Sequence, residues 1–295
     1  DTPRNLDNTV STLTYTITPQ MFSAKNGVGC TSGTPIVVTV NVEPEPKLEF
    51  SETFISICEG VSLDDINNIL STPTTPSAGN VEFVLNGDPV ATGGVTGFSL
   101  GGTVYSPGDE ITDTFDNPSS ANQTVTYRFT PRIVGSTSGT CVGDDVNLVV
   151  TVTPRPVVIP DPADLIPSIA RPTIEVCSSE PRTIDLPIDI ANGISSWTVT
   201  DNPDVDGEFE SLGNSLFLSL INNSDVPQTI TYTVTPFSLF DNSCTGDPIE
   251  IDVIVNPLPE VDIFDASPVR CSGDEAGIPL QGVGNFFTWE AQVVS

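Results

Sequence analysis

The chain has 295 residues, of which 39 are acidic and 9 basic, and no histidine, so its formal net charge is −30. A field of this sign repels phosphate backbones and anionic lipid headgroups, which argues against nucleic-acid binding and electrostatic docking to a membrane, and it makes cations the natural partners. No apolar run reaches the roughly 18 residues of a membrane helix, and residues 1–10 lack the features of a signal peptide. Hydrophobic residues form 37% of the chain in alternating runs, which predicts a folded protein.

A short phrase occurs three times, as TLTYTITP at 12–19, TVTYRFTP at 124–131 and TITYTVTP at 229–236. Its apolar residues alternate with polar ones, the period of a β-strand with one buried face. The central Tyr15, Tyr127 and Tyr232 are therefore expected in a core, with their hydroxyls bonded to the backbone near the strand start. Because proline cannot donate to the next ladder bond, it is expected to end each strand.

A second alternating run follows each phrase, at 36–42, 146–152 and 249–255, and a proline follows it at 44, 154 and 257. The loop between phrase and run holds one cysteine each time. The tyrosines are 112 and 105 positions apart, which suits one β-sandwich of roughly a hundred residues per repeat.

Behind each proline-rich junction the pattern restarts with a second kind of cysteine, in ISICEG, EVCSSE and VRCSGD. An aromatic strand comes later, and its Phe83, Trp197 and Trp289 are expected to face the core as strand-C residues do in immunoglobulin-like sandwiches. Between Cys58 and Phe83, the segment SLDDINNIL at 62–70 has the apolar spacing of one or two helical turns, while its place in the repeat indicates a strand.

The predicted fold class is all-β, with tandem immunoglobulin-like sandwich modules and partial modules at both ends. Residues 1–44 correspond to the C-terminal part of one module, 45–154 and 155–257 to two whole modules, and 258–295 to the N-terminal part of a fourth. Since half a module cannot bury its apolar face, the sequence is expected to be a window on a longer polypeptide.

Six cysteines and one methionine suit an oxidising, extracellular compartment, and the cysteines allow fifteen pairings. Three patterns stay open: neighbours in sequence (30 with 58, 141 with 177, 244 with 271), partners within one module (58 with 141, 177 with 244), or a bond across a module junction (58 with 244). The turn and loop cysteines lie at opposite poles of a standard sandwich, and a disulfide needs Cα atoms within about 7 Å, which favours the junction bond. Metal ligation by these cysteines is not expected, because no CxxC pair or histidine is present.

Calcium is the one ion that the sequence suggests. In DNPDVDGEFE, Asn202, Asp204 and Asp206 alternate before Gly207, with Glu208 following, and a hard ion takes six to eight such oxygen ligands. The alternative is a solvated acidic hairpin, and residues 108–117 supply comparable acids in the preceding module. No other cofactor is expected.

Recognition is expected in pole loops, because a rigid sandwich can present variable loops there. In FSLFDNS, no alternating strand pattern requires Phe237 and Phe240 to be buried, so these two residues form the candidate contact site. No catalytic residues are assigned: a chain without histidine has no Ser-His or Cys-His pair, and its acids are explained by solubility. The chain is therefore not expected to be an enzyme.

Together, the ICEG and RCSG turns, the aromatic strand, the tyrosine phrase, the NSCTGDP loop and the IDVIVNPLP run resemble the PKD-like, immunoglobulin-like repeats of very large Bacteroidetes surface proteins. The resemblance covers the whole chain. It implies export through the type IX system and a place in a surface adhesin, including those of gliding cells.

The expected function is a segment of a long extracellular fibre that holds an adhesive or motility-linked tip away from the cell. Its expected partners are neighbouring modules of the same chain and other copies of the fibre. Two alternatives stay open: modules whose pole loops bind a glycan or a protein, and a spacer in an exported hydrolase.

Overall fold

The structure is a computed structural model that describes residues 2–21, 33–66, 68–136, 139–159, 171–240, 244–263, 269–274, 280–283 and 288–292. Its contacts divide the chain into two units, Asp1–Pro154 and Arg155–Ser295, and each is described by itself. Within the described residues, no helix has the length and apolar character needed to cross a membrane.

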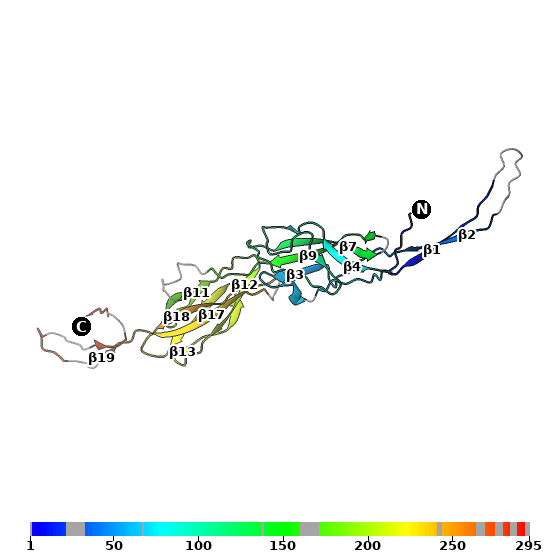
Figure 1. Ribbon diagram of the computed structural model, residues 1–295. Coiled ribbons are helices and arrows are strands. Elements are labelled where there is room, and N and C mark those ends of the chain that lie inside the picture. The colour runs from blue at the N-terminus through cyan, green and yellow to red at the C-terminus, as the bar shows by residue number, and fades with distance from the viewer. Residues whose placement is uncertain are drawn as a thin grey trace. The chain divides into compact units, whose positions relative to one another are not determined.

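The main sheet of the first unit has the strand order β3-β9-β7-β4-β6, with β5 and β8 also paired to β7 (Figure 1). The tyrosine phrase forms β7 and the second alternating run forms its antiparallel neighbour β9. The bounds are Phe54–Cys58 for β3, Asn80–Leu85 for β4, Val90–Ala91 for β5, Val104–Tyr105 for β6, Gln123–Ser136 for β7, Gly139–Val142 for β8 and Val146–Thr153 for β9.

The core of this unit lies on the face of the sheet that carries Phe83, Tyr127 and Phe129, all fully buried. Apolar residues of the segments before β4 and after β6, among them Leu70, Ile111 and Phe115, pack against it. The segment SLDDINNIL lies before β4 and forms one 3-10 turn, η1 at Leu63–Ile66, with Leu63 and Leu70 buried. It is therefore neither a longer helix nor a strand.

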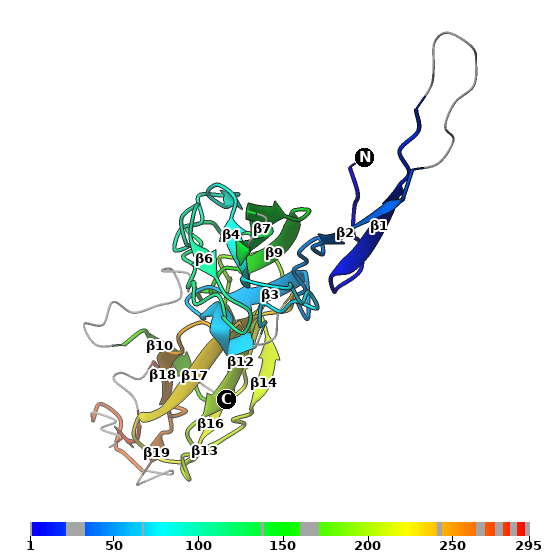
Figure 2. The same ribbon diagram turned by 45° about the vertical axis from the view of Figure 1, so that its right-hand side comes forward.

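The second unit contains a more regular sandwich. One sheet has the order β10-β18-β17-β12-β14 (Figure 2), and the pairs β11-β15 and β13-β16 complete the fold. The bounds are Thr173–Cys177 for β10, Arg182–Asp185 for β11, Gly193–Val199 for β12, Val205–Asp206 for β13, Ser211–Gly213 for β14, Ser215–Leu218 for β15, Ile221–Asn222 for β16, Gln228–Ser238 for β17 and Ile249–Asn256 for β18. Trp197 and Tyr232 are buried in its core, as predicted.

The first and last strands of each module lie side by side and run parallel. β3 pairs with β9 from Phe54↔Val149 to Cys58↔Thr153, and β10 pairs with β18 from Thr173↔Asp252 to Cys177↔Asn256. All other ladders of the two modules are antiparallel, the arrangement of an immunoglobulin-like sandwich whose first strand has moved to the edge of the second sheet.

The prediction that proline ends the tyrosine strands is wrong for two of the three. β7 continues through Pro131 and β17 through Pro236. In a strand, the N–H and C=O of one residue point to the same side. The carbonyls of both prolines accept the N–H groups of Gly143 and Gly246, each at 2.9 Å, so the missing proline N–H faces the loop and the ladder on the other side is intact.

The end segments form smaller pieces. In the first unit, β1 (Ser11–Ile17) and β2 (Ile36–Val42) make an antiparallel hairpin in which Tyr15 is half-buried, unlike its two counterparts. β19 (Asp262–Ile263) and β20 (Leu280–Gln281) pair over two residues each. The prediction that Trp289 is a core residue is wrong, since its side chain is 83% exposed and the described part of 258–295 forms no second layer over it.

One tight turn follows the first strand of each module. The N–H groups of Val61 and Glu180 donate to the carbonyls of Cys58 and Cys177, three residues earlier. The third residue of the turn has a positive φ, 76° at Gly60 and 63° at Ser179. This φ favours glycine, so Ser179 lies in a conformation that strains a residue with a Cβ.

Replacing Ser179 by glycine is therefore expected to stabilise the second module by about 0.5 to 1 kcal/mol. The reverse change at the matching position, Gly60→Ser, should destabilise the first module by a similar amount. Urea denaturation of the 295-residue chain, followed by hydrogen exchange of peptides from each module, measures both. An S179G variant that is less stable than the parent would contradict the strain.

Candidate functional site

The six cysteines fall into two positional classes. Turn cysteines start a tight turn of the kind just described. Cys58 and Cys177 also end the first strand of a module, and the carbonyl of Cys271 accepts the N–H of Asp274 in the same way. Loop cysteines precede the glycine that bonds the proline of the tyrosine strand, two residues before Gly143 at Cys141 and two before Gly246 at Cys244. Cys30 lies outside the described residues.

Among the five cysteines that the structure describes, one of each class is bonded. Cys58 and Cys244 each take part in a disulfide, whereas Cys141, Cys177 and Cys271 are free thiols. The pairs 141–177, 244–271, 58–141 and 177–244 are therefore wrong for this structure, because each needs a cysteine that is free. Pairing of Cys30 with Cys58 would leave the bonded Cys244 without a possible partner, because the three other cysteines are free. Pairing of Cys58 with Cys244 stays a prediction.

The candidate calcium loop is held by its own hydrogen bonds. The side-chain carbonyl of Asn202 accepts from the Asp204 N–H at 3.1 Å, and its amide donates to the Thr229 carbonyl at 3.2 Å. The Asp206 carboxylate accepts from the Asn223 amide at 2.8 Å. In the part of the chain that the structure describes, no three acidic or cysteine side chains are grouped to hold a metal ion. Calcium binding at Asn202, Asp204, Asp206 and Glu208 stays a prediction.

If the loop binds calcium, an excess of the ion over chelator should raise the stability of the second module, by about 2.7 kcal/mol at a hundredfold excess over Kd. An Asp204→Asn, Asp206→Asn variant should lose this gain and keep its melting temperature in chelator. Differential scanning calorimetry measures both proteins. Equal melting temperatures of the parent with and without calcium would remove the site.

The candidate contact loop is partly in place. Phe237 is half-buried, pairs with Ile194 and bridges to Thr245, so the loop's first phenylalanine belongs to the end of β17. Leu239 and Phe240 are 57% and 59% exposed, and the Phe240 N–H donates to the Ser238 hydroxyl at 3.2 Å. Residues 241–243 lie outside the described residues. The exposed apolar pair is therefore Leu239 and Phe240 rather than the two phenylalanines.

Tyr127 differs from the prediction in its partner. Its hydroxyl donates to the Asp113 carboxylate, not to the backbone. Asp113 is buried and also accepts from the N–H and hydroxyl of Ser99, at 2.7 and 2.6 Å. Three donors on one carboxylate satisfy a buried charge, which is why an acid that was expected in solvent lies inside the first module.

Tyr232 has no such partner. Its hydroxyl, the Ser195 hydroxyl, the Trp197 indole N–H and one Glu208 oxygen are buried without a hydrogen bond to any described residue. Burial raises the pKa of Tyr232 to about 12, and the Glu208 carboxylate adds to the rise. Burial also raises the pKa of Tyr127, and the hydrogen bond to Asp113 raises it further.

The two tyrosines should therefore respond differently to loss of the hydroxyl. Tyr127→Phe removes a hydrogen bond to a buried carboxylate and should destabilise the first module by about 1.5 to 3 kcal/mol, whereas Tyr232→Phe should change the second by less than about 0.5 kcal/mol. Both pKa values lie above the value of roughly 10 for a tyrosine in the unfolded chain, so each buried, neutral tyrosine contributes its full stabilisation of the folded module below about pH 10. This stabilisation is lost as the pH rises further, because the unfolded tyrosine then gives up its proton more readily than the folded one. Module-resolved hydrogen exchange at pH 8 and urea titrations at pH 10.5 measure both effects. Equal losses in the two variants would contradict the difference between the modules.

A buried asparagine ten residues before each tyrosine was missed by the sequence analysis. Asn117 donates to the carbonyls of Ala121 and Val152 at 3.0 and 2.9 Å, and Asn222 donates to those of Val226 and Val255 at 2.8 and 2.7 Å. Asn5 makes the same two bonds, to Thr9 and Val42. Each asparagine fixes the turn before the tyrosine strand to the end of the last strand. The identical offset from Tyr15, Tyr127 and Tyr232 was the available signal.

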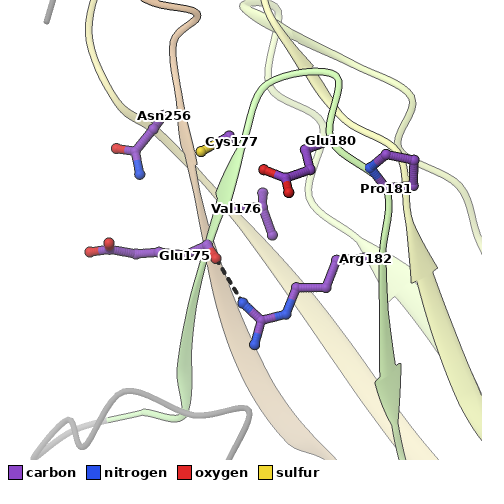
Figure 3. A pocket seen from close by; sticks show the side chains of 7 residues that line it. All are labelled: Glu175, Val176, Cys177, Glu180, Pro181, Arg182 and Asn256. Carbon is purple, nitrogen blue, oxygen red and sulfur yellow. Dashed lines mark hydrogen bonds between the residues drawn. The ribbon is translucent and has the colours of Figure 1, made fainter.

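Cys177 lines a shallow pocket with a volume of about 310 Å³. Figure 3 shows its sulfur in the pocket wall, with Asn256 on one side and Glu180 on the other. The Arg182 guanidinium donates to the Glu175 carbonyl at 3.0 Å, which fixes the charged wall of the pocket. The remaining lining residues are Val176 and Pro181.

Comparison with known families finds the family described as PKD-like domain. Its model matches twice, over residues 56–156 and 174–259, once for each sandwich. No curated protein sequence matches the chain.

Solved structures with a similar arrangement include fibronectin(III)-like modules of Clostridium thermocellum CbhA, with 12% identity and a TM-score of 0.27 over 72% of this chain and 94% of that one. Mouse cadherin-23 EC22-24 has 10% identity and a TM-score of 0.30 over 88% and 89% of the two chains. Drosophila N-cadherin EC1-4 has 12% identity and a TM-score of 0.27 over 94% and 69%.

Proposed function

The chain belongs to the PKD-like domain family, and from that premise we propose that it is a structural segment of a long extracellular fibre or adhesin that projects an adhesive or motility-linked tip. The observation that carries the proposal is the junction between 1–44 and 45–154, where consecutive modules are joined by direct bonds rather than by a free linker.

Several polar contacts form this junction within the first unit. Arg4 pairs with Glu45 at 2.7 Å, and the Lys47 ammonium donates to the Leu6 carbonyl at 3.0 Å and to the Asn8 side chain at 2.8 Å. Thr9 also forms a β-bridge with Thr75. An exposed ion pair alone contributes little, but bonds from both sides of a proline-rich junction restrict its bending.

The bonded cysteines and the net charge of the chain support an extracellular location. Disulfides persist in oxidising compartments, and two of the described cysteines are bonded. The net charge of −30 favours solubility of a repetitive chain. The resemblance to Bacteroidetes surface repeats supports export through the type IX system and a role in adhesion or gliding. No reaction is assigned to the chain.

Immunogold electron microscopy of the source cells, with antibodies raised against the 295-residue chain, tests the proposal. Label is expected on material that extends from the outer surface. Label confined to the cell interior would overturn it, and cells that lack the gene provide the control.

A second candidate function is direct binding, favoured by the exposed Leu239 and Phe240. A glycan array probed with the chain should then give a signal that a Leu239→Ser, Phe240→Ser variant loses. If the parent chain gives no signal at high concentration, the loop is not a glycan site.

A further inference from the structure

The free thiol of Cys177 occupies the same position as a bonded cysteine. Cys58 and Cys177 each end the first strand of a module and pair with the last strand, at Thr153 and Asn256. The carbonyl of each accepts the N–H that closes the same turn, from Val61 or Glu180. Cys58 takes part in a disulfide, while Cys177 is exposed and free. The backbone therefore presents Cys177 in a geometry that carries a disulfide in the sister module.

The loop cysteines show the same relation. Cys141 and Cys244 both lie two residues before the glycine bonded to the tyrosine-strand proline. The residue two positions after each proline also pairs with the cysteine, as Ile133 with Cys141 and Ser238 with Cys244. Cys244 is bonded and Cys141, which is half-buried, is free. Each module thus offers one free thiol, and the two belong to different classes.

The surroundings of Cys177 leave room for a partner. The thiol lies in the shallow pocket formed by Glu175, Glu180, Arg182 and Asn256 (Figure 3). A disulfide requires Cα atoms within about 7 Å, so the partner cysteine has to approach this open pocket closely. Cys141 lies in the short strand β8, which pairs with the end of β7, and its side chain is half-buried, so it is partly accessible.

We propose that Cys177 is a cross-linking site whose partner is the loop cysteine of another PKD-like module, and that Cys141 of a second copy of this chain can fill that role. The proposal rests on the proposed function only for the oxidising compartment. This disulfide joins the turn-cysteine end of one module to the loop-cysteine end of another, since the two kinds of cysteine lie at different ends of a module. Linked copies therefore all point in the same direction.

The chemistry needs a small-molecule disulfide as oxidant. The Cys177 thiolate attacks one sulfur of oxidised glutathione, which forms a mixed disulfide and releases one glutathione thiolate. The Cys141 thiolate of the second copy then attacks the Cys177 sulfur, which forms the protein disulfide and releases the second glutathione. Two protein thiols lose two protons and two electrons, and one glutathione disulfide becomes two thiols.

The test uses the 295-residue chain with Cys30→Ser and Cys271→Ser, incubated with reduced and oxidised glutathione. Non-reducing electrophoresis should show a ladder of oligomers, and peptide mapping should identify a link between Cys141 and Cys177. Adding Cys177→Ser or Cys141→Ser should abolish the ladder. A mixture of these two variants should give dimers and nothing larger, because only one thiol of each class remains.

Links between two Cys177 residues, glutathione adducts without oligomers, or a ladder that survives Cys177→Ser would overturn the proposal. Because Cys141 packs partly against the core, Cys141→Ala serves as a second variant if Cys141→Ser does not fold. None of these outcomes changes where the protein is found by immunogold labelling, so failure of the cross-link and failure of the fibre are distinguishable.

Discussion

Replacing Asn117 by alanine is expected to destabilise the first module by about 2 to 4 kcal/mol, and Asn222→Ala should do the same to the second. Each change leaves one buried backbone carbonyl (Val152 or Val255) and one partly buried carbonyl (Ala121 or Val226) without their donor. It also removes the acceptor of a serine N–H, from Ser119 or Ser224. Buried groups left unpaired lose the full hydration that they have in the unfolded chain.

The matched control is Asn147→Ala, an exposed asparagine on β9 of the first module, which should change stability by less than about 0.5 kcal/mol. Urea denaturation with module-resolved hydrogen exchange distinguishes the two modules. A loss at Asn117 no larger than that at Asn147 would show that the turn does not depend on this side chain.

Alanine at Gly143 or Gly246 is expected to destabilise its module by about 3 kcal/mol. A Cβ at these positions would lie 1.9 Å from the Pro46 carbonyl oxygen and 1.8 Å from that of Pro156. The backbone must move, because neither clash is with the end of a flexible side chain. The shift would separate the cysteine loop from the proline-rich junction.

Gly108→Ala provides the control, because a Cβ at that position would meet open space while the φ of 98° remains unfavourable for alanine. This variant therefore measures conformational strain alone, which should cost about 1 kcal/mol. Calorimetry of the three variants compares the effects. If Gly143→Ala and Gly108→Ala lost equal stability, the close approach to Pro46 would not matter.

Much of the fold could be predicted from periodicity. Val125, Tyr127 and Phe129 alternate with polar residues, and the structure buries all three, as it does the matching residues of β17. The β-sandwich class follows from this alternation and from the repeat length, because a strand with one apolar face must be covered.

Other features depend on contacts that a strand pattern does not contain. Asp113 belongs to the acidic segment 108–117, and only the fold brings Ser99 and Tyr127 to its carboxylate. Pro131 was read as a strand end, since the sequence does not show on which side of the strand its missing N–H lies. Tyr15 and Trp289 match buried residues in sequence, yet burial needs an opposing layer, which the described parts of their segments do not form.

The parallel pairing of β3 with β9 has a mechanical consequence. The chain enters a module at the start of β3 and leaves it at the end of β9, so tension along the polypeptide pulls these neighbouring strands in opposite directions along their length. Their ladder is then loaded in shear, with all its bonds sharing the force instead of opening one after another. The same geometry at β10 and β18 gives the second sandwich the same resistance to stretching.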